Sequence, residues 1–307
     1  MTLFKTLTYA AALASASAYT LTDTYDSSNW LDMFTVQNMG DPTNGHVVYV
    51  DEGTATSNGY ISTANGQVYM GVDHTTVLDP GTGRNSIRLS SNNAYTHYLM
   101  IADIAHAPSS TCGLWPAMWS FGPNWPASGE IDIIENVNTA TNDQMTLHTS
   151  PGCTISAGAQ SGSLGMTDCG ANGGNNGCDM VSNDASSYGS NLDGVYATLW
   201  TSSGISIWYF PRSAIPGDIS SNSPNPDGWG TPAAAFTGCD NGNFDSHFSQ
   251  HNIIFNIDFC GAWADSLWSS QCGSLPDASS CENYVSLHPE AYTDAYWLIN
   301  SLKIYSV

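Results

Sequence analysis

The sequence predicts an all-β protein built as a sandwich of two antiparallel sheets. Short segments rich in β-branched and aromatic residues alternate with clusters of Gly, Asn, Ser and Asp, and no segment shows a sustained 3.6-residue apolar period. Many short strands separated by such turns are typical of a β-sandwich or jelly roll. The expected strands include residues 45–50, 67–72, 86–90, 97–104 and 206–210.

The N-terminal residues 1–18 have the pattern of a secretory signal peptide. Lys5 provides a cationic start, residues 7–13 are mostly apolar, and residues 16–18 are small. We therefore expect residues 19–307 to form a single extracellular β-sandwich domain. No later apolar run reaches the roughly 20 residues that a transmembrane helix needs.

The charge balance is strongly acidic, with 5 Lys plus Arg against 27 Asp plus Glu and a formal net charge of −22. Nucleic acids and anionic membranes both require dense positive charge on a partner, so neither is expected to bind. The acidity is accounted for by solubility at mildly acidic pH, and it is compatible with a neutral partner such as a sugar polymer. We expect a monomer.

The cysteines form an even set of eight, so up to four disulfides are expected in an oxidising compartment. Their order alone does not determine the pairing. No C-x-x-C pair occurs, so no structural zinc or other metal is expected. Residues 150–191 are rich in Gly, Asn and Ser and predict a long loop held by disulfides. The eight cysteines are Cys112, Cys153, Cys169, Cys178, Cys239, Cys260, Cys272 and Cys281.

Residues 130–135 interleave three acids with three isoleucines. Because side chains alternate along a strand, Glu130 and Asp132 lie on one face while isoleucines enter the core. Perfect alternation would send Glu135 inward, which is costly for an unpaired charge. A β-bulge near residues 133–134 would return Glu135 to the acidic face, giving three carboxyls in a row.

Such a row suits glycoside hydrolysis, in which one carboxylate attacks the anomeric carbon and a second carboxylic acid protonates the departing oxygen. Asp132, between the glutamates, would share a proton or hydrogen bond and help to hold their pKa values apart. The alternatives are an acidic calcium site or a solvated edge strand. Neither gives the neighbouring tryptophans a role.

The run Glu130–Glu135 resembles the E-x-D-x-x-E signature of glycoside hydrolase family 16 in its laminarinase-like form. The resemblance covers nearly all of residues 19–307 and is strongest to basidiomycete laminarinases. It implies a β-jelly-roll catalytic domain with an open substrate cleft, no cofactor, and retaining endo attack on β-1,3 or mixed β-1,3-1,4 glucan. It also implies Glu130 as nucleophile, Glu135 as acid/base and Asp132 as assisting acid. Further matching segments are residues 83–88, 112–117, 145–149 and 259–263.

Four of the ten tryptophans are candidate substrate platforms, because sugar rings present apolar C–H faces that stack on indoles. The alternative for each is core packing, and this alternative is strongest for the first of them. The four are Trp115, Trp119, Trp125 and Trp263.

Two arginines and one histidine complete the candidate site. Arg88 resembles the sugar-contacting arginine of the family and offers a fork of donors. Arg84 is four residues away, so we expect it on the same strand face, either binding sugar or bracing acidic neighbours. His148 lies where the family keeps a histidine in its substrate cleft, although an ordinary strand histidine is the alternative.

Other classes of protein are less consistent with the sequence. It contains no G-x-S-x-G and no H-E-x-x-H, which disfavours a serine hydrolase and a zinc peptidase. A transglycosylase would use the same carboxylates, but cell-wall transglycosylases resemble a shorter E-x-D-x-E form. A glucan-binding lectin on this sandwich would lack the acids, which are all present here. The preferred linkage depends on the shape of loops beside the cleft, which the sequence does not supply.

Overall fold

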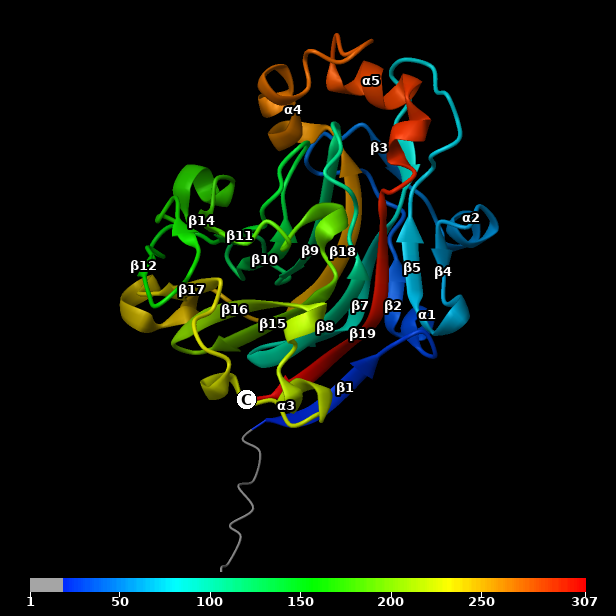
Figure 1. Cartoon of the computed structure of the whole chain (residues 1–307). Coiled ribbons are helices and arrows are strands. Elements are labelled where there is room, and N and C mark those ends of the chain that lie inside the picture. Colours follow the sequence, from blue (N-terminus) through cyan, green and yellow to red (C-terminus); the bar gives the residue numbers. More distant parts are fainter. Residues whose placement is uncertain (1–18) are drawn as a thin grey trace, which may run out of the picture.

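The all-β prediction is confirmed by the computed structural model, which describes residues 19–307; the predicted signal peptide lies outside the described residues. Within this range the strands form two large antiparallel sheets and one small parallel pair, β3 (Val47–Tyr49) with β6 (Arg84–Ser86). Figure 1 shows the two large sheets stacked face to face. This is the two-layer arrangement of a β-sandwich.

The first large sheet contains the C-terminal strand near its centre. The order of its strands in the described chain is β12 (Ser156–Ala157), β17 (Ala234–Thr237), β16 (Gly204–Pro211), β15 (Gly194–Thr201), β8 (Tyr98–His106), β19 (Tyr296–Ser306), β5 (Val68–Gly71) and β4 (Ile61–Ser62), with β1 (Thr20–Tyr25) also paired to β19.

The second large sheet contains the acidic strand near its centre. Over residues 19–307 its order is β13 (Ser163–Leu164), β14 (Cys178–Val181), β11 (Gln144–His148), β10 (Glu130–Glu135), β9 (Leu114–Phe121), β18 (His251–Phe259), β7 (Arg88–Tyr95) and β2 (Phe34–Val36).

Apolar side chains from both sheets meet in one core. Met118 and Ile131 from the second sheet and Trp200 and Ile304 from the first belong to the same buried cluster. Removing this apolar surface from water is the main favourable term in folding. Since the core uses one face of β10, the other face is free to carry its acids.

The outer face of the first sheet is covered by its own smaller cluster. Leu99 and Trp208 of this sheet pack with Ile219 and Trp229, which come from the segment that contains α3 (Gly217–Ser220). The first sheet is therefore covered on both faces in this region, and the candidate chemistry lies on the second sheet.

Two helices between β18 and β19 depart from the sequence prediction, α4 (Gly261–Gln271) and α5 (Cys281–Leu287). Two shorter ones, α1 (Trp30–Met33) and α2 (Glu52–Ser57), lie near the N-terminus. In α4 the buried side chains of Ala264 and Trp268 are four residues apart, which is too short a pattern to predict a helix. Isolated helices of this length are marginal in water, so packing and disulfides must hold α4. Within residues 19–307 no helix is both long and apolar enough to cross a bilayer.

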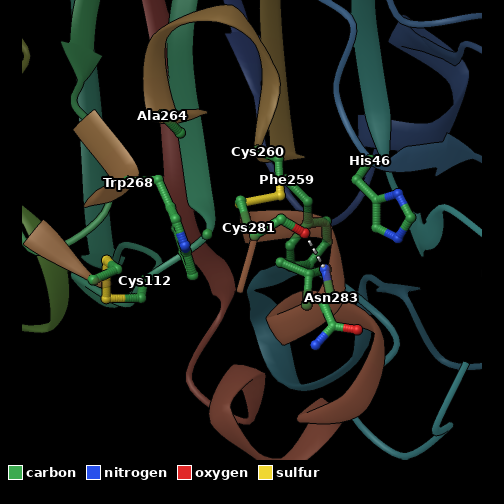
Figure 2. Close-up of a disulfide and its surroundings, with 12 residues drawn as sticks. His46, Cys112, Phe259, Cys260, Ala264, Trp268, Cys281 and Asn283 are labelled. Atoms are coloured by element: carbon green, nitrogen blue, oxygen red, sulfur yellow. Dashed lines mark hydrogen bonds between the residues drawn. A yellow bond between two sulfur atoms is a disulfide. The ribbon is translucent and has the colours of Figure 1, made fainter. Parts of the chain in front are cut away.

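All eight cysteines of the described chain pair into four disulfides, as expected. Two of them attach the helices to the second sheet: Cys112–Cys272 joins the start of β9 to the end of α4, and Cys260–Cys281 joins the end of β18 to α5. Figure 2 shows the latter bond, with Trp268 of α4 nearby. These bonds hold α4 and α5 at one end of the sandwich (Figure 1).

The other two disulfides, Cys153–Cys239 and Cys169–Cys178, hold the long segment predicted at residues 150–191. This segment also contains the short strands β12, β13 and β14, which the sequence did not predict. Strand β14 pairs with β11 and so extends the second sheet on the β11 side of the acidic strand.

We expect the disulfide with the longest sequence separation to contribute most to stability. The Cys112–Cys272 bond spans 160 residues and Cys169–Cys178 spans 9. On the chain-entropy account, the double change Cys112→Ala/Cys272→Ala should lower the free energy of unfolding by roughly 2 kcal/mol more than Cys169→Ala/Cys178→Ala. Denaturant unfolding of the two variants measures this difference. An equal or larger loss for the short-range pair would contradict it.

Candidate active site

The acidic strand β10 contains the predicted β-bulge. Along its pairing with β9, β10 advances two residues between Asp132 and Ile134 while β9 advances one. Ile133 is the extra residue, and its insertion changes the phase of the alternation. Glu135 therefore returns to the face that carries Glu130 and Asp132, as the sequence predicted.

The three carboxyls differ in exposure. Asp132 is 1% exposed and Glu135 9%, whereas Glu130 is partly exposed. The interleaved isoleucines, Ile131, Ile133 and Ile134, are fully buried in the core between the sheets. The acids consequently form a row on the outer face of the second sheet, with Glu130 as its most accessible member.

Each glutamate accepts a hydrogen bond from its own tryptophan. The indole Nε1 of Trp115 donates to Glu135 Oε1 at 2.7 Å, and that of Trp125 donates to Glu130 Oε2. An N–H donor stabilises the ionised carboxylate. The sequence predicted these tryptophans as stacking platforms and did not reveal this donor role. The side chain of Trp125 is nevertheless 42% exposed, so part of its surface is available for a ligand.

His148 lies directly across from Glu130 in the pairing of β10 with β11. Its Nδ1 is 2.6 Å from the carbonyl oxygen of Gly174, so this nitrogen must carry a hydrogen, and its Nε2 is 3.2 Å from Asp132 Oδ2. Burial disfavours the charged ring, but the close contact with Asp132 and the charge of Glu130 outweigh it and raise the pKa of His148 to about 10. His148 is therefore a cation within the acidic row, which an ordinary strand histidine would not be.

The pKa values of the acids are raised, first by burial in each case. The charge of Glu130 contributes to a pKa of about 7 for Asp132, and the charge of Asp132 contributes to a pKa of about 8 for Glu135. For each glutamate, His148 and its own indole donor oppose the increase in pKa. At neutral pH Glu135 is nevertheless largely protonated, and Glu130, the most accessible of the three acids, is the carboxyl whose ionised form is best supported.

A second aromatic group lies on the same face of the sheet. The indole N–H of Trp119 donates to Asn256 Oδ1 at 2.7 Å, the Arg88 guanidinium carbon lies 4.8 Å from the Trp119 ring centre, and Phe121 stacks on Trp119 at 5.1 Å. Arg88 also donates from Nε to Gln37 Oε1 at 3.0 Å. The sequence predicted Arg88 and Trp119. It missed Phe121 and Asn256, because isolated aromatic and amide residues in strands carry no specific signal.

Trp263 reaches the site from helix α4. Its ring meets that of Trp115 edge to face, with centres 5.7 Å apart and planes at 87°. Cys260, which is bonded to Cys281, directly precedes α4. This disulfide therefore helps to hold Trp263 against Trp115, the tryptophan that donates to Glu135.

Arg84 is not part of this face, and the expectation that it shares a strand face with Arg88 is wrong. Arg84 lies in β6 and Arg88 in β7, and the fully buried Arg84 donates to backbone carbonyls that include those of Asp73 and Val285. Its guanidinium is also 3.6 Å from the Asp73 carboxylate. Arg84 therefore braces the acidic Asp73 and the backbone of α5, and bracing acidic neighbours was one of the two roles expected for it.

One group of side chains in the row could hold a cation. Glu130, Asp132 and His148 offer ligand atoms within 4.8 Å of one another. The proton that His148 carries on Nε2 in its charged form competes with a metal for the same nitrogen, so the protonated histidine and a metal exclude each other. The absence of a metal stays a prediction.

Comparisons with known proteins show similarity to a family of glycoside hydrolases and to proteins named endo-1,3(4)-β-glucanases. Residues 34–305 match a family model described as the XgeA-like catalytic domain of glycoside hydrolase family 16. The chain is 42% identical over 302 residues to a probable endo-1,3(4)-β-glucanase of Aspergillus niger, covering 95% of this chain and 40% of that protein. It is 42% identical over 308 residues to an endo-1,3(4)-β-glucanase of Arthroderma benhamiae, covering 96% and 66%. The chain thus spans 40–66% of the length of these two curated relatives.

Solved structures agree with the fold. A crystal structure of an elongating family 16 β-1,3-glucosyltransferase has a TM-score of 0.88 and 42% identity, covering 94% of this chain and 100% of that one. A laminarinase from Phanerochaete chrysosporium, solved with 6-O-glucosyl-laminaritriose in donor and acceptor sites, has a TM-score of 0.87 and 39% identity, covering 94% and 99%.

The indole donors should have separable effects on the two glutamates. Replacing Trp115 by Phe removes the N–H that stabilises ionised Glu135, so the pKa of Glu135 should rise by about half a pH unit to one pH unit, the equivalent of roughly 1 kcal/mol. Carboxyl ¹³C NMR titration measures this change. The matched control Trp125→Phe should raise the pKa of Glu130 and leave that of Glu135 nearly unchanged; a fall for Glu135 in Trp115→Phe would contradict the donor role.

Proposed function

The chain belongs to glycoside hydrolase family 16, and we propose that it is a secreted retaining endo-hydrolase of β-1,3 and mixed β-1,3-1,4 glucans. The observation that carries this proposal is the row Glu130, Asp132 and Glu135 on one sheet face, in which each glutamate has its own indole donor. Retaining glycosidases require one ionised and one protonated carboxyl beside the scissile bond.

Glu130 is proposed as the nucleophile. It is partly exposed, it lies across the strand pair from protonated His148, and it accepts the indole N–H of Trp125. These contacts favour the carboxylate. In the first step the Glu130 carboxylate forms a bond to the anomeric carbon as the bond to the glycosidic oxygen breaks, which leaves a glycosyl ester on Glu130.

Glu135 is proposed as the acid/base. With a pKa raised to about 8 by burial and by the charge of Asp132, it holds a proton at neutral pH and can donate it to the departing oxygen. In the second step the Glu135 carboxylate accepts a proton from water, whose oxygen attacks the anomeric carbon and releases Glu130. Asp132 is proposed as the assisting acid, since it lies between them and contacts His148.

The proposed ligand is a β-glucan chain on the outer face of the second sheet. Trp115, Trp119, Trp125 and Trp263 supply the aromatic surface and Arg88 a fork of donors. The choice of β-1,3 and mixed linkages is supported by the names of the relatives. A neutral polymer also suits a protein with a net charge of −22.

Secretion is supported by the four disulfides, which are stable in oxidising compartments. We propose that residues 1–18 are the signal peptide, that residues 19–307 are a single catalytic domain, and that the chain acts as a monomer without a cofactor or a nucleic acid or membrane partner.

A second candidate function is glucosyl transfer, which the similarity to the elongating glucosyltransferase favours. The same carboxylates would form the same glycosyl ester. In the second step a sugar hydroxyl, instead of water, would attack the anomeric carbon and pass its proton to Glu135.

The proposed nucleophile is tested by Glu130→Gln. An amide cannot form the glycosyl ester, so cleavage of laminarin and barley mixed-linkage glucan should fall by about 10³-fold or more. Product analysis measures cleavage, and circular dichroism confirms that the variant is folded. The substitution Arg84→Lys, at a buried structural site away from the acidic row, serves as a control for general effects on folding. A folded Glu130→Gln variant with undiminished cleavage would refute the assignment.

Transfer and hydrolysis are separated by product length. Incubation with laminarihexaose, followed by mass spectrometry, should give mainly oligosaccharides shorter than the substrate if water is the acceptor. Products longer than the substrate that persist as the dominant species at low conversion would establish the transferase instead.

A further inference from the structure

A fourth carboxyl, Asp143, lies behind the acidic row and has no role in the mechanism above. It directly precedes β11, and its side chain is fully buried. Its Oδ1 accepts the backbone N–H of Glu135 at 2.9 Å, and its Oδ2 lies 2.9 Å from the hydroxyl of Tyr196 in β15. Among the described residues no Lys, Arg or His forms an ion pair with Asp143.

Asp143 bonds a backbone N–H of β10 that lies beyond the pairing of β10 with β11. Strand β10 pairs with β11 only from Glu130 to Asp132, so beyond this point β10 lacks a ladder on that side. A buried backbone N–H left without a partner is costly. The side chain of Asp143 bonds the N–H of Glu135, and so it fixes the backbone of the residue whose carboxyl accepts the indole of Trp115.

The hydrogen bonds of Tyr196 determine the protonation of Asp143. The Tyr196 hydroxyl is 2.6 Å from the backbone oxygen of Ser187, and because a carbonyl only accepts, the single hydroxyl hydrogen lies in that bond. The 2.9 Å contact between this hydroxyl and Asp143 Oδ2 therefore needs a hydrogen on the carboxyl. Asp143 then donates to Tyr196, which donates to Ser187.

The surrounding charges favour the same neutral form. The titratable groups that face Asp143 are Glu135 and Asp132 of β10, Tyr196 of β15 and Tyr188, and none of them is a cation. Burial and the charges of Glu135 and Asp132 raise the pKa of Asp143 well above its usual range. An ionised Asp143 would also place another negative charge beside Glu135 and raise the pKa of the proposed acid further.

We infer that Asp143 is a positioning residue that acts as a neutral carboxylic acid, linking the backbone of Glu135 to Tyr196 and so holding the acid/base glutamate against Trp115. This inference rests on the proposed function of Glu135. It assigns Asp143 no contact with the substrate.

The substitution Asp143→Asn tests the inference, because a carboxamide has one acceptor oxygen and one donor group and so matches a protonated carboxyl. We expect kcat to stay within about threefold of the wild type and the alkaline limb of the pH–rate profile to stay in place. If Asp143 is ionised in the wild type, the substitution removes a negative charge beside Glu135, and the alkaline limb moves to lower pH. That result would overturn the inference.

The substitution Asp143→Leu is the contrasting variant, since it removes both hydrogen bonds at similar volume. We expect kcat to fall at least about tenfold with KM little changed, because a misplaced acid affects the transition state more than substrate binding. Wild-type kcat in a folded Asp143→Leu variant would overturn the positioning role.

Infrared spectroscopy provides a readout that requires neither activity nor the Leu variant. In the Glu135→Gln background, at a pH above the pKa of Asp132, adding Asp143→Asn should remove one carbonyl band of a protonated carboxylic acid from the difference spectrum. The buried Asp258, whose pKa is also raised by burial, contributes equally to both spectra and cancels. A difference spectrum in which no such band is lost would overturn the inference. Failure of the proposed function would be recognised separately, as undiminished glucan cleavage by Glu130→Gln.

Discussion

The β-bulge in β10 is the constraint on which the candidate site depends. A regular strand would bury Glu135 in the core, whereas the single extra residue, Ile133, places both glutamates and Asp132 on one face and all three isoleucines in the core. The pairing of β10 with β11 stops at Asp132, where the bulge begins, and the side chain of Asp143 bonds the backbone N–H of Glu135 beyond that point. The segment of β10 that carries the acid/base glutamate is therefore supported by a side chain and not by a strand ladder on that side.

The acidic row is stabilised with very little positive charge. The described chain offers few cations, and one of them, Arg84, is buried elsewhere against backbone carbonyls. The row uses His148 as its cation and the indole N–H groups of Trp115 and Trp125 as donors. Neutral donors partly stabilise an ionised carboxyl without adding a full charge, so the pKa values of neighbouring acids can remain high. This suits a site in which one glutamate must keep its proton at neutral pH.

At the end of the sandwich that carries α4 and α5, two disulfides support a helix that contacts the candidate site. Cys112–Cys272 and Cys260–Cys281 hold these helices, and α4 brings Trp263 against Trp115, which in turn donates to Glu135. A short helix with little amphipathic pattern is stable there because covalent bonds and the buried Trp268 hold it. Residues of α4, which are distant from the acids in sequence, thereby form part of the surroundings of Glu135.

The sequence by itself determined the all-β class, the acidic strand with its bulge, and the even set of cysteines, because alternation, the cost of burying charge and residue type are local properties. Only the tertiary structure decided the disulfide pairing, the separation of Arg84 from Arg88, the indole donors, and the positions of Phe121, Asn256 and Asp143. These features depend on contacts between residues distant in the chain. Asp143 and Tyr196 are 53 residues apart and meet only when the two sheets pack together.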